Sequence, residues 1–352
     1  MTIKNKIVKF LAVLSLGIVS VSCDNKVTEV AKYPTTLEIL KGNSNYSVLV
    51  KALDATSLSS TFNNSGSYTL FAPNNTAFAA YTSVNFPAGI TESTFPVAPA
   101  TLSSAQITEL KKLLQNHILG VGTRANDLVA NAYSKTFATG VGTTTLSMFV
   151  NQVSGNYTIN GGAANGGTII TTSDIDASNG VLHLVDNVIK LPTLKNHLIA
   201  NPDLANFYAI YTSGASGTYG DQSAVLATLS ASGPTTVFAP VNTTVTAETA
   251  TGGFIASNNT ASNVSKILKY HMATGNLTSS STTSWTSSSA TTDATITTLA
   301  ATSQTFKIAL GTLKITELPT PYTSVSNIKT VNIQATNGVI HTVDRVLRPI
   351  LP

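Results

Sequence analysis

The stretch NGVLHLVDNVI at residues 179–189 decides the fold, because NGVIHTVDRVL at residues 337–347 nearly repeats it. The offset from position 179 to position 337 is 158 residues. That period is too long for a solenoid unit and has the size of a whole domain. The chain is therefore expected to contain two copies of one fold, each with its own core.

Two further pairs of segments repeat in the same order. TLFAPNNTAF at 69–78 corresponds to TVFAPVNTTV at 236–245, and KLLQNH at 112–117 corresponds to KILKYH at 266–271. The offsets differ from pair to pair, as expected when loops between matching segments grow or shrink at small entropic cost. Three ordered pairs make a duplication the simplest interpretation.

The first copy is expected at residues 33–192 and the second at 193–352, with almost no linker between them. Each copy is long enough for one buried core. Apolar residues at helical spacing come first, and Thr/Val/Ile-rich runs with Gly/Asn turn signals follow after Gly120. Helices followed by strands favour an α+β fold over an alternating α/β fold.

Local patterns in the first copy predict individual elements. Helices are expected over 36–40, 47–53 and 102–118, and a strand over 68–72. Pro73 is expected to end the strand, and Asn74 or Asn75 to cap a helix that continues through Phe78 and Tyr81.

The N-terminus predicts the compartment. Residues 1–22 combine three lysines with an apolar run too short to span a bilayer, as in a signal peptide. The next residue is Cys23, the only cysteine, which resembles the lipidated cysteine of a bacterial lipobox. The alternative is an ordinary signal peptide cut elsewhere, which leaves a free thiol. We expect lipidation at Cys23, a tether over 23–32, and a membrane anchor that does not span the bilayer.

Charge argues against nucleic-acid binding. The net charge is +4, but three of these charges are Lys4, Lys6 and Lys9 of the leader, so the remaining chain carries about +1. Charged residues make up only 10% of the chain and form no basic stripe, so a phosphate backbone finds no matching surface.

Taken together, the FAP segments, the helices that end in His and the NGV(L/I)H segments resemble the fasciclin-type domain, in two tandem copies. The resemblance covers nearly all of the chain after the leader. It implies a wedge-shaped β-sandwich with helices packed along one side, and a role in extracellular adhesion or surface interactions. Fasciclin-type domains are not generally enzymes, so no catalytic residue, cofactor or metal is expected.

Several residues follow from the resemblance. Asn75 and Asn242 match the asparagine after the FAP motif and are interpreted as structural caps. The second copy has Val245 where the first has Phe78, which indicates a repacked pocket.

A Tyr-His pair contributes to integrin binding in some animal members of the family. Tyr270-His271 matches that pair, and Asn116-His117 stands at the same place in the first copy. These four residues are binding candidates. The alternative is that they pack at the end of a helix.

Two His-Asp pairs are candidates for a catalytic dyad, His183 with Asp186 and His341 with Asp344. Positions three apart on a strand point to opposite faces, however, so the two side chains of each pair cannot meet directly. We expect these residues to be buried structural partners. No nucleophile elbow, phosphate loop or metal-ligand spacing appears. His197 stands apart and is expected to be solvated.

Two segments are further binding candidates. Trp285, the only tryptophan, lies in the Ser/Thr-rich run 278–292 and is suited to stacking on a sugar ring. The alternative is that it anchors this loop to the domain. The Pro-rich insertion 86–99 carries Phe86 and Phe95, which either form a surface or fold back on the first copy.

These observations predict a lipid-anchored, non-enzymatic protein of the bacterial cell envelope, at the outer membrane and facing the surface or the periplasm. Its expected partners are the membrane, through the lipid, and envelope or extracellular proteins or glycans. The second hypothesis is an accessory lipoprotein that binds a glycan or another small ligand. The third is an envelope hydrolase.

Overall fold

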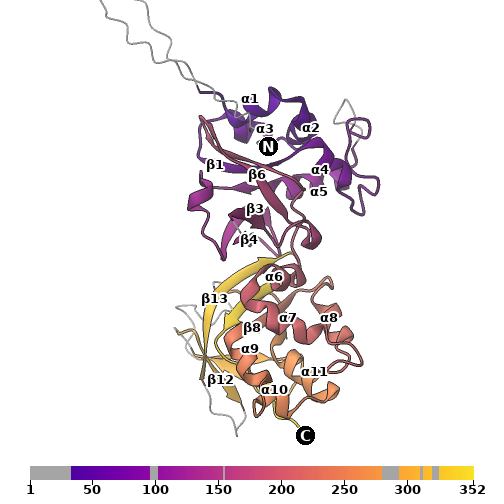
Figure 1. The fold of residues 1–352 in the computed structure, drawn as a ribbon, viewed down its shortest axis with the longest axis vertical. Coiled ribbons are helices and arrows are strands. Elements are labelled where there is room, and N and C mark those ends of the chain that lie inside the picture. Colours follow the sequence, from indigo (N-terminus) through magenta and orange to yellow (C-terminus); the bar gives the residue numbers. More distant parts are fainter. Residues whose placement is uncertain (1–32, 96–101, 154, 280–292, 310–311, 319–324) are drawn as a thin grey trace, which may run out of the picture. The chain divides into compact units, whose positions relative to one another are not determined.

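The computed structural model describes residues 33–95, 102–153, 155–279, 293–309, 312–318 and 325–352. It contains two α+β copies of one arrangement, in which α-helices and one strand come first and six further strands complete a seven-stranded sheet (Figure 1). The predicted α+β class is confirmed.

The first copy opens with helices and continues with strands. Its helices and one-turn helices are α1 (Thr36–Lys41), η1 (Ser44–Tyr46), α2 (Ser47–Ala55), α3 (Ser59–Asn63), α4 (Asn75–Ala80), α5 (Ser104–Gln115), η3 (Ala125–Asp127) and η4 (Ala163–Asn165). Its strands are β1 (Tyr68–Pro73), β2 (Ile118–Leu119), β3 (Ala132–Thr139), β4 (Thr145–Val153), β5 (Asn156–Ile159), β6 (Thr168–Ala177) and β7 (Gly180–Val185).

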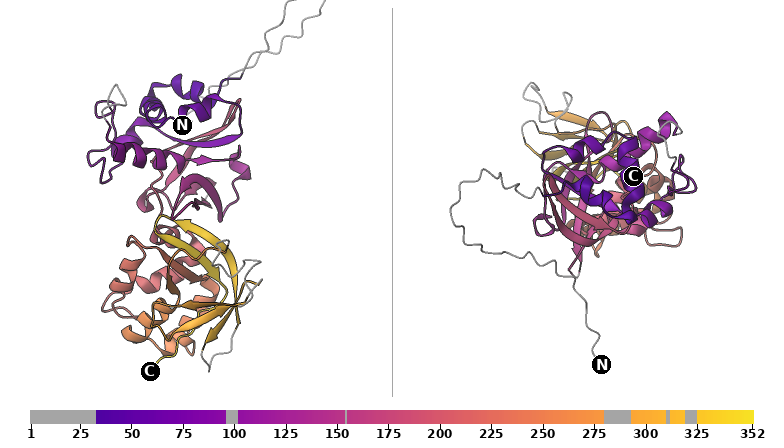
Figure 2. Two further views of the ribbon diagram at one scale, coloured as in Figure 1. Left: turned by 180° about the vertical axis from the view of Figure 1, so that it is seen from behind. Right: turned by 90° about the horizontal axis from the view of Figure 1, so that it is seen from above.

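The second copy repeats this order. Its helices are α6 (Leu194–Ala200), η5 (Pro202–Leu204), α7 (Ala205–Tyr211), α8 (Ser223–Thr228), α9 (Asn242–Thr249), α10 (Phe254–Ser257) and α11 (Ala261–Tyr270). Its strands are β8 (Thr235–Pro240), β9 (Met272–Thr274), β10 (Ala294–Thr297), β11 (Thr305–Ile308), β12 (Lys314–Leu318), β13 (Val325–Ala335) and β14 (Gly338–Val343). Figure 2, seen from behind, shows its helices along one side of its sheet.

The two sheets differ in closure. In the first copy β1 pairs parallel with β7 and antiparallel with β2, and the seven strands close into a barrel where a sandwich was expected. The second copy has the strand order β10-β11-β12-β13-β14-β8-β9. There β9 is joined to the segment after β10 by a single bridge, Ala273 to Thr298.

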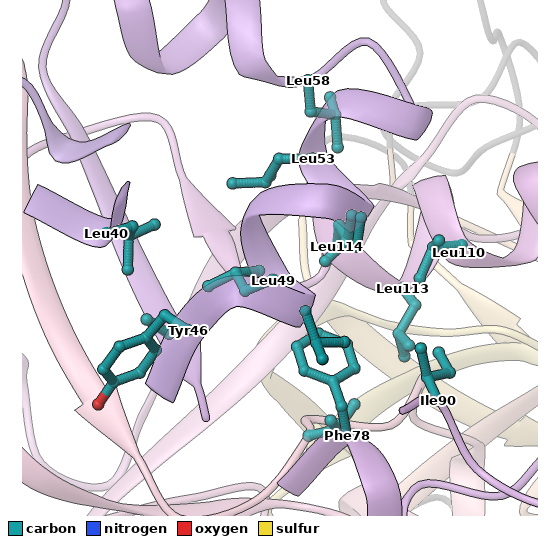
Figure 3. Close-up of a cluster of buried hydrophobic side chains, with 14 of the residues drawn as sticks. Leu40, Tyr46, Leu49, Leu53, Leu58, Phe78, Ile90, Leu110, Leu113 and Leu114 are labelled. Atoms are coloured by element: carbon teal, nitrogen blue, oxygen red, sulfur yellow. The ribbon is translucent and has the colours of Figure 1, made fainter. Parts of the chain in front are cut away.

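The strand of the FAP motif separates two cores in each copy. Leu70 and Ala72 of β1 face the helices, whereas Phe71 points into the barrel. In β8, Val237 and Ala239 face the helices and Phe238 points the other way. Both faces are buried, so these strands read as continuous apolar runs. Figure 3 shows the helix-side core of the first copy, where Leu49, Phe78 and Leu113 lie close together.

The local predictions are largely confirmed. Asn74 caps α4 by accepting the Ala77 amide at 2.8 Å. Ser103 begins α5 with a capping box to Gln106. The helix predicted over 102–118 ends earlier, at Gln115, because the residues that follow Asn116 and His117 form strand β2.

The aromatic residues of the insertion fold back on the first copy. Phe86 is 7% exposed and Phe95 4% exposed, and both belong to the helix-side core. They therefore contribute to stability, and they offer no aromatic surface to a partner.

Over the residues described, no helix combines the length and the apolar character needed to cross a membrane.

Candidate functional site

Each copy holds a buried histidine just after its longest helix. His117 Nδ1 donates to the Leu113 carbonyl at 2.8 Å, and Nε2 accepts the Ile189 amide at 2.9 Å. His271 makes the same two contacts, with Nε2 accepting the Leu347 amide at 2.9 Å. Each ring thereby fastens the end of a helix to the segment that follows the last strand.

A second buried histidine lies on the last strand of each copy. His183 Nδ1 accepts the Asp174 amide at 3.2 Å, and Nε2 donates to the Thr123 carbonyl at 2.9 Å. His341 Nδ1 accepts the Asn332 amide at 3.4 Å in the same arrangement. Asp174 and Asn332 have φ values of 62° and 59° at irregular points of β6 and β13, so the histidine stabilises a bulge.

These contacts leave the four histidines neutral and occupied. Burial lowers the pKa of His117, His271 and His341 to about 4, and it also lowers the pKa of His183. One ring nitrogen donates and the other accepts, so neither is available as a base or a metal ligand. Across the described residues, no group of three or more His, Cys, Asp or Glu side chains is placed to hold a metal ion.

The aspartates near these histidines bind other groups. Asp186 Oδ1 accepts the Thr168 hydroxyl at 2.7 Å and the Ile169 amide at 2.9 Å. Asp344 Oδ1 likewise accepts the backbone amide of Asn327 on the neighbouring strand β13. Burial alone raises the pKa of Asp186, but these hydrogen bonds outweigh it and hold the pKa below its usual value. The expectation that Asp186 is buried is wrong, because it lies at the exposed end of the strand.

The asparagine of each NGV segment joins the two ends of its copy. Asn179 Oδ1 accepts the Thr36 amide at 2.9 Å, and its Nδ2 donates to the Phe62 carbonyl at 2.7 Å. Asn337 accepts the Leu194 amide at 2.9 Å in the same way. The sequence pattern indicated only a turn at these positions, because the partners lie 143 residues away in both copies.

Asn75 and Asn242 cap helices from other segments. Asn75 Oδ1 accepts the Val48 amide at 3.0 Å, and Asn242 Oδ1 accepts the Asn206 amide at 2.9 Å. These amides belong to the first turns of α2 and α7, so neither asparagine caps the helix that it begins.

The four binding candidates at the helix ends lie inside the protein. Asn116, His117 and His271 are 0% exposed and Tyr270 is 1% exposed. The Tyr270 hydroxyl donates to the Thr305 carbonyl at 2.8 Å. This arrangement corresponds to packing at a helix end. The other two candidates, Cys23 and Trp285, lie outside the described residues.

His197 is not solvated, so that expectation is wrong. Its side chain is 0% exposed, and Nε2 lies 3.2 Å from the Gln334 carbonyl. Its ring and that of Tyr133 in the first copy form a T-shaped pair, with ring centroids 5.5 Å apart. His197 therefore lies where the two copies meet.

The same junction contains polar contacts between β4 and β13. Ser147 Oγ accepts a hydrogen bond from the backbone amide of Gln334 at 2.9 Å, and both residues are buried. Lys135 Nζ donates to Ser147 Oγ at 2.9 Å and to the Asn332 carbonyl at 2.6 Å. No sequence motif marked this junction.

Comparison with known proteins gives a consistent family match. The model of the Fasciclin domain matches residues 44–192 and 217–349. Protein sll1483 of Synechocystis sp. is 31% identical over 158 residues, which cover 45% of this chain and 74% of that protein. The transforming growth factor-beta-induced protein ig-h3 of Sus scrofa is 25% identical over 170 residues, which cover 46% of this chain and 20% of that protein.

Among solved structures, a FAS1 domain pair from the insect cell adhesion molecule fasciclin I aligns with 89% of this chain and 98% of its own length. The TM-score is 0.48 and the sequence identity is 16%.

Proposed function

Because the chain belongs to the fasciclin family, we propose that it is a non-enzymatic protein of the bacterial envelope that mediates adhesion or surface contact with proteins or glycans. Fasciclin domains are associated with cell adhesion and surface interactions. Cys23 carries the lipid that anchors the protein, at the outer membrane, and the short tether keeps the first copy near the bilayer.

The observation that carries this proposal is the match of both copies to the family, over most of the chain. The chemistry of the described polar residues supports it. His183 and His341, which the sequence suggests as possible bases, hold backbone groups in place, with both ring nitrogens engaged. These buried histidines therefore have a structural role, and the proposal assigns them none in catalysis.

The test combines location with binding. Intact cells are treated with protease and probed for the protein, and the same cells are scored for attachment to immobilised matrix proteins and glycans. We expect loss of the protein without lysis, together with attachment that a deletion strain lacks. A Cys23→Ser variant should be released from the membrane. Protection from protease in intact cells, or equal attachment by the deletion strain, argues against the surface role.

A further inference from the structure

A cavity of about 430 Å³ lies beside the Ser147–Gln334 contact, with walls from both copies. Its polar walls include Asn131, Tyr133 and Lys135 of the first copy and Asn201, Asp203 and Lys329 of the second. The volume lies within the range of small-ligand sites. It has room for roughly a dozen water molecules, and so for one small organic molecule.

Lys135 brings a positive charge without a counter-ion to this cavity. Its ammonium group donates to the Ser147 hydroxyl and the Asn332 carbonyl, which are both neutral acceptors. Among the described residues, no carboxylate oxygen lies within 4.0 Å of Lys135 Nζ, the distance that defines an ion pair. The Lys135 side chain as a whole is exposed, but partial loss of water around its ammonium group lowers its pKa, and no neighbouring acid offsets that effect. An anion in the cavity would neutralise this charge.

Tyr133 brings a second donor to the same cavity. Its hydroxyl oxygen accepts Asn201 Nδ2 at 3.4 Å, and the hydroxyl proton is donated to none of the acceptors that the described residues supply. Burial raises the pKa of Tyr133, so the hydroxyl stays protonated. A ligand oxygen that accepts from both Tyr133 and Lys135 would satisfy two donors at once.

The charges and polar groups on the other walls of the cavity indicate which kind of anion would fit. Lys329 lies 3.6 Å from Asp344, so its charge is already balanced. Asp203 adds a negative charge to the wall, which disfavours a dianion such as phosphate and favours hydroxyl groups that donate to its carboxylate. The Asn131 and Asn201 amides can donate to or accept from further hydroxyls.

We propose that this cavity binds a small monoanion that carries one carboxylate and several hydroxyl groups, as an acidic sugar does. The carboxylate accepts from Lys135 and Tyr133, and the hydroxyls contact Asp203 and the asparagines. The proposal does not depend on the adhesive role, because a protein that attaches to nothing can still bind the sugar.

The test is calorimetric titration of the whole chain without its leader, with galacturonate as the probe. Galactose serves as the matched ligand without a carboxylate, and inorganic phosphate as the dianion. We expect galacturonate to bind at least about tenfold more tightly than either, because a charge-assisted hydrogen bond contributes about that factor. No binding of galacturonate at about 10 mM, equal binding of galactose, or tighter binding of phosphate overturns the proposal.

Two variants locate the site. Lys135→Gln should weaken galacturonate binding by at least about tenfold, whereas Lys314→Gln makes the same charge change on an exposed lysine outside the cavity and should leave it unchanged. Tyr133→Phe keeps the ring against Phe149 and His197 and removes only the hydroxyl, so it tests the site even if Lys135→Gln loosens the junction. Wild-type affinity in the Tyr133→Phe and Lys135→Gln variants would refute the assignment.

Discussion

Asn75 Oδ1 accepts a hydrogen bond from the Val48 amide at 3.0 Å, and so it caps a helix that lies 27 residues earlier in the chain. Helix α2 has no side-chain cap from its own flanking residues, and neither does α7, which Asn242 caps in the same way. The asparagine after the FAP motif thus links the start of α2 to the end of β1, and the start of α7 to the end of β8. Its role is therefore tertiary and not local.

Replacing this cap should destabilise the first copy. We expect Asn75→Ala to lower the free energy of unfolding by about 1–2 kcal/mol, because the Val48 amide loses its acceptor. Urea unfolding measures the change. Asn45→Ala is the control, since the Asn45 side chain is exposed and makes no hydrogen bond with the described residues. If the two variants lose the same stability, the cap contributes nothing.

A milder variant separates the two halves of the amide. Asn75→Asp keeps the acceptor for Val48 but loses the donor to the Ser44 carbonyl and the Ser47 hydroxyl, both 3.0 Å away. We expect the free energy of unfolding of Asn75→Asp to lie between that of wild type and that of Asn75→Ala. A loss larger than that of Asn75→Ala would contradict the capping role.

The glycine of each NGV segment is required by close backbone packing. Gly338 has φ of +150°, and a Cβ there would lie 1.8 Å from the Thr235 carbonyl oxygen on the paired strand β8. We expect Gly338→Ala to cost at least about 3 kcal/mol, because strand β14 must move away from β8 or strain its backbone. Thermal unfolding measures the cost. Gly214→Ala adds a methyl group with no atom within 4 Å and should leave the midpoint unchanged.

Much of the fold was predictable because its strongest signals are short and local. Phe71 and Phe238 stand in strands whose continuous apolar runs follow directly from burial on both faces. Asn74 was predictable as a cap because its partner Ala77 lies three residues away. The end of α5 was predicted too late, because Ile118 continues the apolar pattern although its backbone belongs to a strand.

The junction and the cavity were not predictable, because their partners are far apart in the sequence. His197 and Gln334 are separated by 137 residues, and Ser147 and Gln334 by 187. No periodicity links such positions, and a lone histidine that directly follows Lys195 and Asn196 is expected to be exposed. Closure of the first sheet depends on a short pairing between β2 and β3, which is equally invisible in composition.

The junction itself makes a prediction. Ser147→Ala removes the acceptor of the buried backbone amide of Gln334, and leaving a buried donor unsatisfied costs about 1–3 kcal/mol. We therefore expect calorimetry to show the two copies unfolding at more widely separated temperatures than in wild type. Ser134→Ala, on strand β3 with no side-chain hydrogen bond to the described residues, is the control. An unchanged calorimetric trace would show that the contact does not couple the copies.

The buried histidines predict how stability depends on pH. Burial lowers the pKa of His197, His271 and His341 to about 4 in the second copy, from 6.5 in the unfolded chain. The unfolded chain therefore takes up protons first as the pH falls. The contribution of these histidines to the free energy of unfolding should be constant above about pH 7 and fall between pH 6.5 and 4, with a slope of up to about 1.4 kcal/mol per pH unit for each histidine.

The two copies should differ in this response. The first copy has two such histidines, His117 and His183, so its stability should fall less steeply than that of the second, which has three. Hydrogen exchange followed by mass spectrometry between pH 7 and 4 resolves the copies, with peptides from α5 and α11 as reporters. A His271→Gln variant cannot take up the proton, so its second copy should be less stable at pH 7 but should lose stability less steeply on acidification. Equal slopes in the two copies, or a slope unchanged by His271→Gln, would contradict this prediction.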